Sequence, residues 1–275
     1  MAKCGAPKRV RLAKVCACIK LNRMTKLCII IPAYNEQTRI TKTLHEYHSY
    51  FSAQQELETE LLVVLNGCKD ATAQVVAQAQ QQLPNLRMIE LKEAGKGLAI
   101  AAGFANAIDR SYDLIGFVDA DMATRPEHFH ALIKNMNSHD GAIASRYMAG
   151  AQVYPPRPWV KEWGRKIVYH GLIRLLFNLW YKDLQCGAKV FRRSVIQAIV
   201  PHMTVQQWAF DVELLYLCKK NKFKIKEVPT VWHDQAESKL LVMRSGIRML
   251  GSLFAVRVRH SPFRSYYANK KRVAH

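Results

Sequence analysis

The segment Leu114-Ile115-Gly116-Phe117-Val118-Asp119-Ala120-Asp121 joins an apolar run to two carboxylates. The apolar part predicts a short buried strand, and the aspartates follow it at once. In an open α/β sheet, ligands bind at the carboxyl ends of the strands. Mg²⁺ and Mn²⁺ prefer carboxylate oxygens and leave coordination positions for phosphate. The segment therefore predicts a metal–diphosphate site, and the alternative is a solvated turn, because Asp-x-Asp is common.

Strand and helix patterns alternate around this segment. Four further apolar runs predict strands over residues 27–31, 60–65, 86–91 and 141–145. Helical patterns separate them, over residues 37–52, 70–82, 97–109 and 126–137. This alternation predicts an α/β domain with a Rossmann-like, parallel nucleotide-binding sheet and helices on both faces. Beyond residue 150 the pattern is less regular, with a proline-rich break at 154–158 before a helix expected over 160–180.

The net charge of +20 is concentrated at the two ends of the chain. Residues 1–26 contain eight Lys or Arg and no acid, and residues 238–275 contain nine and no acid. Residues 27–237 are close to neutral, at +3. Basic ends on a nearly neutral core predict an anionic partner, either a membrane surface or nucleic acid. Residues 1–23 are either a basic extension or a misread start, because Met24 leads directly into the first predicted strand.

Cysteine usage and hydropathy favour a cytoplasmic location. The seven cysteines form no Cys-x-x-Cys pair, and Cys16 and Cys18 are too close together for a usual zinc site. Reduced cysteines packed as small apolar side chains are the expected state. No apolar run is long enough to predict a transmembrane helix, and the basic N-terminus lacks the apolar core of a signal peptide.

Polar groups follow each of the first four predicted strands. The first strand leads into Pro32-Ala33-Tyr34-Asn35-Glu36, and the second leads into Asn66-Gly67-Cys68-Lys69-Asp70. The third precedes Gly95-Lys96-Gly97, and the fourth ends in the two aspartates. Because the carboxyl ends of parallel strands meet at one edge of a sheet, we expect these groups to converge on one crevice.

These segments resemble the inverting family 2 glycosyltransferases, which have a GT-A fold, a Pro-x-Tyr-Asn-Glu opening and an Asp-x-Asp element. The second half of the chain adds the segments Asp183–Arg193, Trp208–Leu215, Lys226–Trp232 and Ser238–Leu240. Together they are similar to the dolichyl-phosphate glucosyltransferase and polyprenyl-phosphate glycosyltransferase branch. The resemblance covers residues 25–250. It implies a basic extension (1–24), a GT-A domain (25–236) and a basic amphipathic tail (237–275).

The resemblance implies that the strand-end groups bind a nucleotide sugar and a divalent metal ion. Tyr34 is expected to pack on the base and Glu36 to hold the nucleoside, although the helix dipole also explains Glu36. Asp70 is expected either near the base or as a cap of the following helix. The implied nucleotide-sugar set is Pro32, Tyr34, Glu36, Asn66, Asp70, Lys96, Gly97 and Asp119. Asp119 and Asp121 are expected to hold Mg²⁺ or Mn²⁺, which neutralises the departing diphosphate.

The same resemblance assigns Arg146, Arg165, Gln185 and Lys189 to the acceptor phosphate. The planar fork of arginine suits phosphate, and a surface helix is the alternative explanation for Arg165. Asp211 matches the position where many family members place a general base, so the implied catalytic set is Asp119, Asp121, Asp211 and Arg146. A phosphate monoester is already anionic at neutral pH, and with such an acceptor Asp211 would position groups instead of removing a proton. Glu213, two residues later, is equally expected to belong to the site or to lie outside it.

Two departures from the family pattern concern specificity. Leu65-Asn66 replaces a usual pair of aspartates, the first of which commonly reads the base, so UDP and GDP both stay open. This departure also raises a catalytically inactive family member as an alternative. Ala188 replaces the aromatic residue that usually follows Cys-Gly, which widens the expected acceptor region.

The basic tail indicates the kind of acceptor independently. Residues 240–258 place Met243, Ile247, Leu250 and Phe254 on one helical face, and Arg244 and Arg248 on another. A helix with a basic polar face suits the interface of an anionic membrane. The alternative is a helix that covers the core and has a solvated back.

The predicted function is inverting transfer of a sugar, with glucose from a UDP-sugar preferred, to polyprenyl or dolichyl phosphate. The protein is expected at the cytosolic face of a membrane as a peripheral protein. Its expected partners are the nucleotide sugar, the lipid phosphate and the anionic membrane surface, with a membrane-anchoring partner as a further option. The alternatives are transfer to a hydroxyl of a sugar or lipid head group, and a basic binding protein without activity. Nucleic acid is not expected as a partner, because the core lacks interleaved aromatic and basic residues.

Overall fold

The computed structural model describes residues 24–155, 170–205, 207, 209–233 and 242–261, with only the backbone for 242–250. Several expectations therefore lie outside the described residues. They are the basic extension up to residue 23, Arg165, residues 160–169 of the helix expected over 160–180, the tail after residue 261, and the side chains of Met243, Arg244, Ile247, Arg248 and Leu250.

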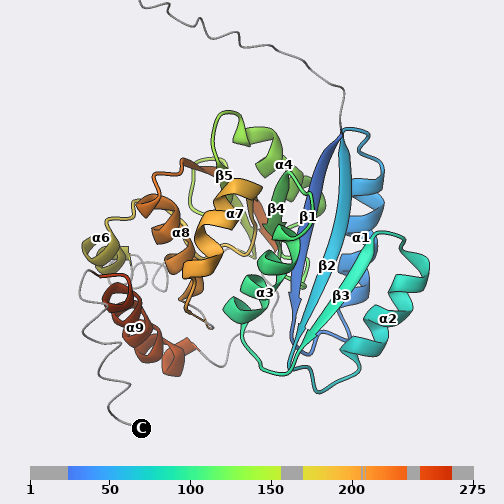
Figure 1. Ribbon diagram of the computed structural model, residues 1–275, viewed down its shortest axis with the longest axis horizontal. Coiled ribbons are helices and arrows are strands. Elements are labelled where there is room, and N and C mark those ends of the chain that lie inside the picture. The colour runs from blue at the N-terminus through green and yellow to red at the C-terminus, as the bar shows by residue number, and fades with distance from the viewer. Residues whose placement is uncertain (1–23, 156–169, 206, 208, 234–241, 262–275) are drawn as a thin grey trace, which may run out of the picture.

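A seven-stranded sheet forms the centre of the molecule, in the order β3-β2-β1-β4-β7-β5-β8 (Figure 1). The strands are β1 Thr25–Ala33, β2 Leu57–Asn66, β3 Leu86–Leu91, β4 Leu114–Phe117, β5 Gly141–Ser145, β7 Lys189–Arg192 and β8 Ile225–Pro229. β1 pairs in parallel with β2 and β4, and β5 pairs in parallel with β8. These pairs confirm the predicted α/β fold, and each predicted strand lies where the pattern placed it.

One strand departs from the parallel sheet that the sequence predicts. β7 runs antiparallel to both β4 and β5. Its start, at Lys189, pairs with Phe117 at the end of β4. The preceding residues therefore enter the sheet from the edge where the parallel strands end. The antiparallel strand brings the segment over residues 183–188 to the predicted crevice.

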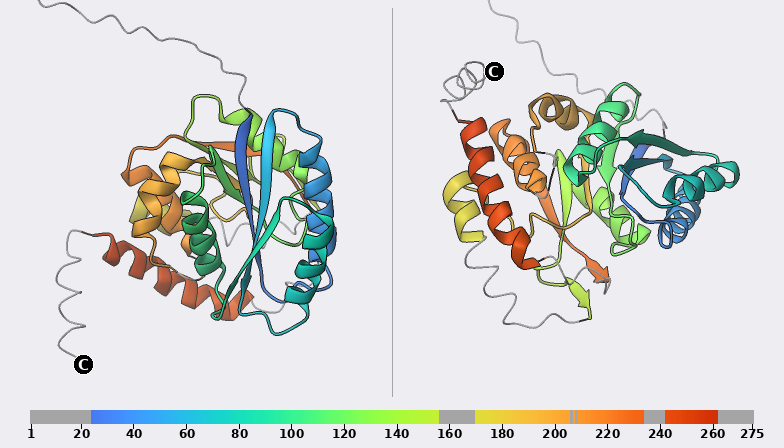
Figure 2. Two further views of the ribbon diagram at one scale, coloured as in Figure 1. Left: turned by 45° about the vertical axis from the view of Figure 1, so that its right-hand side comes forward. Right: turned by 90° about the horizontal axis from the view of Figure 1, so that it is seen from below.

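Helices cover both faces of the sheet, as predicted. They are α1 Ile40–Ser52, α2 Thr72–Gln82, α3 Lys96–Ile108, α4 Pro126–Met136, α6 Gly171–Phe177, α7 Arg193–Ile199, α8 Phe210–Lys220 and α9 Val242–Arg259. A short 3₁₀ turn, η2 (Val200–His202), follows α7, and a small second sheet pairs β6 (Gln152–Tyr154) with β9 (Val231–His233). The views in Figure 2 show α1 and α2 on one side of the sheet, and α3, α7 and α8 on the other.

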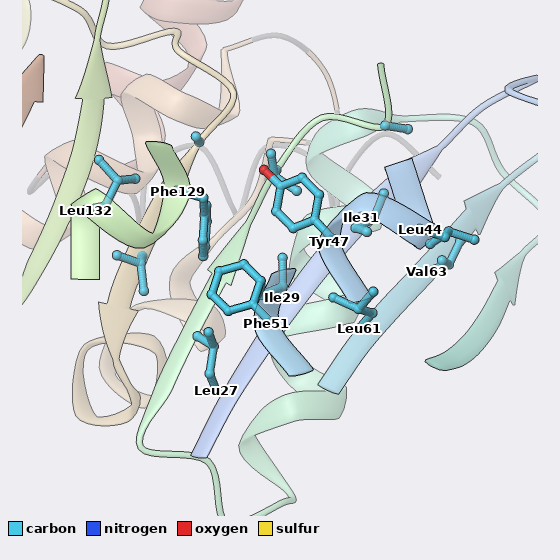
Figure 3. Close-up of a cluster of buried hydrophobic side chains, with 14 of the residues drawn as sticks. Leu27, Ile29, Ile31, Leu44, Tyr47, Phe51, Leu61, Val63, Phe129 and Leu132 are labelled. Atoms are coloured by element: carbon cyan, nitrogen blue, oxygen red, sulfur yellow. The ribbon is translucent and has the colours of Figure 1, made fainter. Parts of the chain in front are cut away.

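Two apolar cores result from the alternation of side chains along the strands. On β1, Ile29 and Ile31 enter the core that also contains Tyr47, Phe51 and Phe129 from α1 and α4 (Figure 3). The next-door residues, Cys28 and Ile30, enter the second core with Phe104, Phe117 and Phe210. A strand buried on both faces is a near-continuous apolar run, which is why β1 was recognisable in the sequence.

The C-terminal helix α9 packs on the second core. Leu253 and Val256 are fully buried in that core, whereas Phe254 on the same helix is 51% exposed. The described part of α9 thus covers the core with one face and leaves an aromatic side chain outside. No helix among the described residues is long and apolar enough to cross a membrane.

Candidate active site

Asn66 joins three of the strand-end segments. Its Nδ2 donates to Ala33 O at 2.9 Å, and its Oδ1 accepts from Gly95 N at 3.2 Å. The residue is the last of β2, and the side chain is buried. Because both ends of the amide are bound to backbone, Asn66 fixes the crevice instead of facing it. The sequence analysis expects Asn66 to contact the nucleotide sugar, whereas its contacts in the structure are those of a scaffold.

The segment after β1 opens the crevice. Pro32 is buried within β1, and Tyr34 just beyond it is 48% exposed, which leaves one ring face free for stacking. Glu36 accepts from Arg39 Nε and Nη2 at 2.8 and 2.9 Å. Burial raises the pKa of Glu36, and Arg39 opposes this rise. Glu36 is therefore paired with Arg39 directly before α1. This contact fits the alternative explanation, in which Glu36 stabilises the start of that helix.

Asp70 is held at the start of α2. Its carboxylate accepts from Thr72 N at 3.0 Å, from Thr72 Oγ1 at 2.5 Å and from Gln37 N at 3.3 Å. Burial acts to raise the pKa of Asp70, but these hydrogen bonds lower it below its ordinary value. Asp70 was expected either near the base or as a cap of the following helix, and its contacts are those of a residue that caps the start of α2.

The two aspartates after β4 form the centre of the site. Asp119 is ion-paired with Lys96 Nζ, and Asp121 Oδ1 accepts from Ala123 N at 3.0 Å. Lys96 is the first residue of α3 and is followed by the buried Gly97, so the glycine loop delivers the ammonium directly to Asp119. The predicted convergence of the third and fourth strand ends is therefore present.

Gly187 lies against Asp119 from the other side. A Cβ added to Gly187 would overlap the Oδ2 and Cγ atoms of Asp119. Only glycine allows the segment before β7 to approach the carboxylate this closely. Gly187 was not predicted as a site residue. The only sequence feature that could have indicated it is the Cys186-Gly187 pair just before the antiparallel strand.

The electrostatics of the pair favour a bound cation. Burial and the neighbouring charge of Asp119 raise the pKa of Asp121 to about 6. Burial acts to lower the pKa of Lys96, but Asp119, Asp211 and Asp121 raise it overall. Within the described part of the chain, no group of three or more His, Cys, Asp or Glu side chains could hold a metal. Two adjacent, partly buried carboxylates fit a metal ion that takes its remaining ligands from phosphate and water.

A buried ion pair lies beside the aspartates. Lys189 is fully buried, and its Nζ lies 2.5 Å from Asp211 Oδ1 and donates to Cys186 O at 2.7 Å. Burial raises the pKa of Asp211, and Lys189 and Lys96 act in the opposite direction. The structure thus does not place the Lys189 ammonium on an open acceptor surface, as the sequence analysis expects. It places the ammonium under Asp211.

Arg146 is held by a second buried pair. Its Nε and Nη2 donate to the two oxygens of Asp183 at 2.7 and 2.9 Å, and its guanidinium lies 4.8 Å from the centre of the Trp232 ring. Burial acts to raise the pKa of Asp183, but Arg146 lowers it overall. Gln185 N also donates to Asp183 Oδ1, at 3.2 Å, so Gln185 lies in the same cluster.

Asp183 is the residue of this cluster that the sequence analysis does not single out. Its backbone N–H and that of Lys182 donate to Glu227 on β8, so the segment is fixed at both ends. The sequence offered one signal for Asp183. It opens a segment shared with the family and follows Arg146, the arginine assigned to phosphate, by 37 residues. Asp119 interacts electrostatically with Lys96, Arg146 and Asp211, so these predicted residues lie in one region, whereas Arg165 lies outside the described residues.

Comparison with known proteins identifies the family of this chain. The family model described as "Glycosyl transferase family 2" matches residues 28–200. A dolichyl-phosphate beta-glucosyltransferase of Trichomonas vaginalis is 34% identical over 78% of this chain, which covers 65% of that protein. One of Dictyostelium discoideum is 30% identical over 85% of this chain, which covers 74% of that protein.

Solved structures show the same fold. Glucosyl-3-phosphoglycerate synthase from Mycobacterium tuberculosis, in complex with UDP, has a TM-score of 0.62 and 16% identity. The similarity covers 85% of this chain and 79% of that one. The same enzyme has also been solved with Mn²⁺, UDP-glucose and phosphoglyceric acid. The GT-A fold predicted from the sequence is therefore confirmed, and this chain belongs to glycosyl transferase family 2.

Proposed function

We propose that this protein transfers glucose from UDP-glucose to dolichyl or another polyprenyl phosphate, with inversion at the anomeric carbon. The observation that carries the proposal is the Asp119–Asp121 pair at the end of β4, with Lys96 and Gly187 packed against it. The names of the relatives support glucose and dolichyl phosphate. The chemistry of the site supports a diphosphate leaving group.

Asp119 and Asp121 would hold the divalent metal ion, Mg²⁺ or Mn²⁺. When bound, such an ion stabilises the negative charge that develops on the departing diphosphate. The Mn²⁺ in the mycobacterial synthase supports a metal at this site in the shared fold. The raised pKa of Asp121 supports it as well, because a cation would relieve the repulsion between the two carboxylates.

The chain's own residues would bind the donor. Tyr34 presents an exposed ring on which the base can stack, while Asn66 keeps the loops that flank the nucleotide in register. Lys96 is 25% exposed beside Asp119, so its ammonium can contact a diphosphate oxygen while it stays near the carboxylate. This places positive charge on the side of the leaving group.

The acceptor phosphate needs no general base. In the transfer, a phosphate oxygen forms a bond to the anomeric carbon, and the bond from that carbon to the UDP oxygen breaks with its electron pair leaving on UDP. The acceptor oxygen is anionic at neutral pH, so no proton has to be removed. Asp211, fixed by its ion pair with Lys189, would then position the charged groups near the anomeric carbon. Arg146, fixed by its ion pair with Asp183, would supply positive charge for the acceptor phosphate.

The acceptor lipid would be reached from a membrane surface. Exposed apolar side chains lie on or near α6 and α9, which pack together in the views of Figure 2. They are Leu175, Trp180, Phe254 and Val258. Arg174 lies 5.0 Å from the Trp180 ring, so cationic and apolar groups alternate there. We therefore propose a GT-A domain over 25–236 and a basic interfacial tail over 237–275, at the cytosolic face and peripheral or held by an anchoring partner.

The acceptor is tested by offering two lipids that differ in one group. Wild-type protein is incubated with labelled UDP-glucose and Mn²⁺ in anionic vesicles that contain either dolichyl phosphate or dolichol. Product is expected with dolichyl phosphate alone, and Asp211→Asn is expected to retain part of this activity. Transfer to dolichol that disappears with Asp211→Asn would instead establish the alternative, a hydroxyl acceptor with Asp211 as general base.

A further inference from the structure

Glu213 is a fully buried carboxylate that the transfer chemistry does not use. It lies in the first turn of α8, two residues after Asp211. Its oxygens accept from Thr204 N at 2.9 Å, Thr204 Oγ1 at 2.6 Å and Val205 N at 2.8 Å. A buried carboxylate is stable only while its hydrogen-bond donors stay in place. Glu213 therefore fixes the backbone of Thr204 and Val205, which supplies these donors.

The end of α9 completes this cluster. His260 Nε2 lies 2.7 Å from Glu213 Oε1, and the His260 side chain is almost fully buried. Arg259 Nη1 donates to Thr204 O and Oγ1, both at 3.3 Å. We call Glu213, Thr204 and His260 the α9 latch. From α8, Lys220 Nζ also donates to His260 O, at 3.4 Å, so α9 is held to α8 at this point.

The segment held by the latch continues to the donor side of the site. Gln207, three residues after Thr204, donates from Nε2 to Ala94 O at 3.3 Å. Ala94 precedes Gly95, whose N–H is bound by Asn66, and Lys96, which pairs with Asp119. Contacts therefore link the end of α9 to Thr204 and Val205, and link Gln207, further along the same segment, to the loop that carries the ammonium beside the two aspartates.

We propose that Glu213 is a positioning residue, which fastens α9 to Thr204 and Val205 and, through Gln207 of the same segment, holds the Ala94–Lys96 loop beside Asp119. On this proposal, α9 in its docked position is required for tight binding of the nucleotide sugar. Since α9 is also the helix that we place at the membrane, the latch connects the lipid side of the protein to the donor side; this last point rests on the proposed function.

The first test is amide hydrogen exchange on the whole chain without any substrate. His260→Ala removes the imidazole that contacts Glu213, and His45→Ala, on an exposed position of α1, is the matched control. We expect His260→Ala to speed exchange of both 203–207 and 92–98 by about fivefold, a typical coupling between contiguous elements. Faster exchange at 203–207 with 92–98 unchanged would overturn the proposal, and so would no change in either.

A second variant cuts the connection at an exposed side chain, where folding is not at risk. Gln207→Ala removes the bond to Ala94 O and leaves the latch intact. We expect faster exchange at 92–98 with 203–205 unchanged, and an unfolding midpoint equal to that of wild type. Because the two changes act on one route, the double variant with His260→Ala should exchange at 92–98 no faster than the faster single variant. Additive effects would contradict a route through Gln207.

Kinetics separate positioning from mere stability. Both His260→Ala and Gln207→Ala should raise KM for UDP-glucose several-fold. Gln207→Ala, which leaves α9 docked, should also leave KM for dolichyl phosphate unchanged, because the affected loop lies on the donor side. Equal kinetics for Gln207→Ala and wild type would overturn the proposal. If the exchange pattern appears but wild type transfers no glucose, the latch stands and the proposed function fails.

Discussion

The two halves of the site are held together in different ways. Around β1 and β2, neutral groups bind backbone atoms: the Asn66 amide holds Ala33 and Gly95, and the Asn35 side chain accepts from Lys69 N. Around β7 and α8, buried charged side chains are held by other side chains. Lys189 pairs with Asp211 and Arg146 with Asp183, and the Glu213 carboxylate contacts the His260 imidazole. A lost neutral hydrogen bond costs little, whereas a lost partner leaves a charge stranded in the interior.

Lys189 offers the most direct test of this difference between the two halves of the site. Lys189→Met should lower the free energy of unfolding by about 3–5 kcal/mol, because Asp211 stays buried without its partner. Urea denaturation measures this loss. Lys189→Met with Asp211→Asn removes both charges and should recover part of it. Equal losses in the single and double variants would show that the pair is not the source of the stability.

Gly187→Ala should damage activity far more than stability. Its Cβ would displace the Asp119 carboxylate, and a misplacement of this size typically reduces turnover about 100-fold. Gly171→Ala is the matched control, because a Cβ there meets nothing within 4 Å. Glucosyl transfer is measured for both, with thermal unfolding as the check on folding. An active Gly187→Ala protein would mean that Asp119 does not need its observed position.

Asn66→Ala should have a moderate effect, as expected for the half held by neutral groups. The loss of its two backbone contacts should cost about 2 kcal/mol in unfolding free energy and raise KM for the donor. Asn135→Ala, which loses a single bond to Ala131 O within α4, serves as the control with a smaller loss. A loss as large as that of Lys189→Met would contradict the difference between the halves.

Asp70 should give the smallest effect, and its signature is a loss of stability as the pH falls in the acid range. Hydrogen bonds lower its folded-state pKa, so the unfolded chain takes up the proton first as the pH falls. The stabilisation is therefore present above the unfolded pKa of about 3.9 and is lost as the pH falls through the folded value. Unfolding free energies of wild type should decline more steeply below pH 4 than those of Asp70→Asn, as measured by denaturation at several pH values. Parallel declines would show that the bonds to Asp70 contribute nothing.

The sequence predicted the half of the fold whose signals are local. β1 to β4, their helices and the strand-end groups were recognisable because apolar runs and turn residues lie next to one another in the chain. The antiparallel β7 and its approach through Gly187 were not, because pairing of Lys189 with Phe117 joins residues 72 positions apart. Separation in sequence also concealed the bond between Arg146 and Asp183, which are 37 positions apart. It left Lys189 assigned to the acceptor, whereas the structure pairs it with Asp211, 22 positions later.

The central claim is that Asp119 and Asp121 hold a metal ion that the transfer of glucose to a lipid phosphate requires. The direct test is transfer from labelled UDP-glucose to dolichyl phosphate in anionic vesicles, with Mn²⁺ or with EDTA, for wild type and Asp121→Ala, and with Asp109→Asn, at an exposed site, as control. We predict product for wild type and Asp109→Asn with Mn²⁺, and none with EDTA or for Asp121→Ala. Full activity of wild type in EDTA, or of Asp121→Ala with Mn²⁺, would contradict the claim.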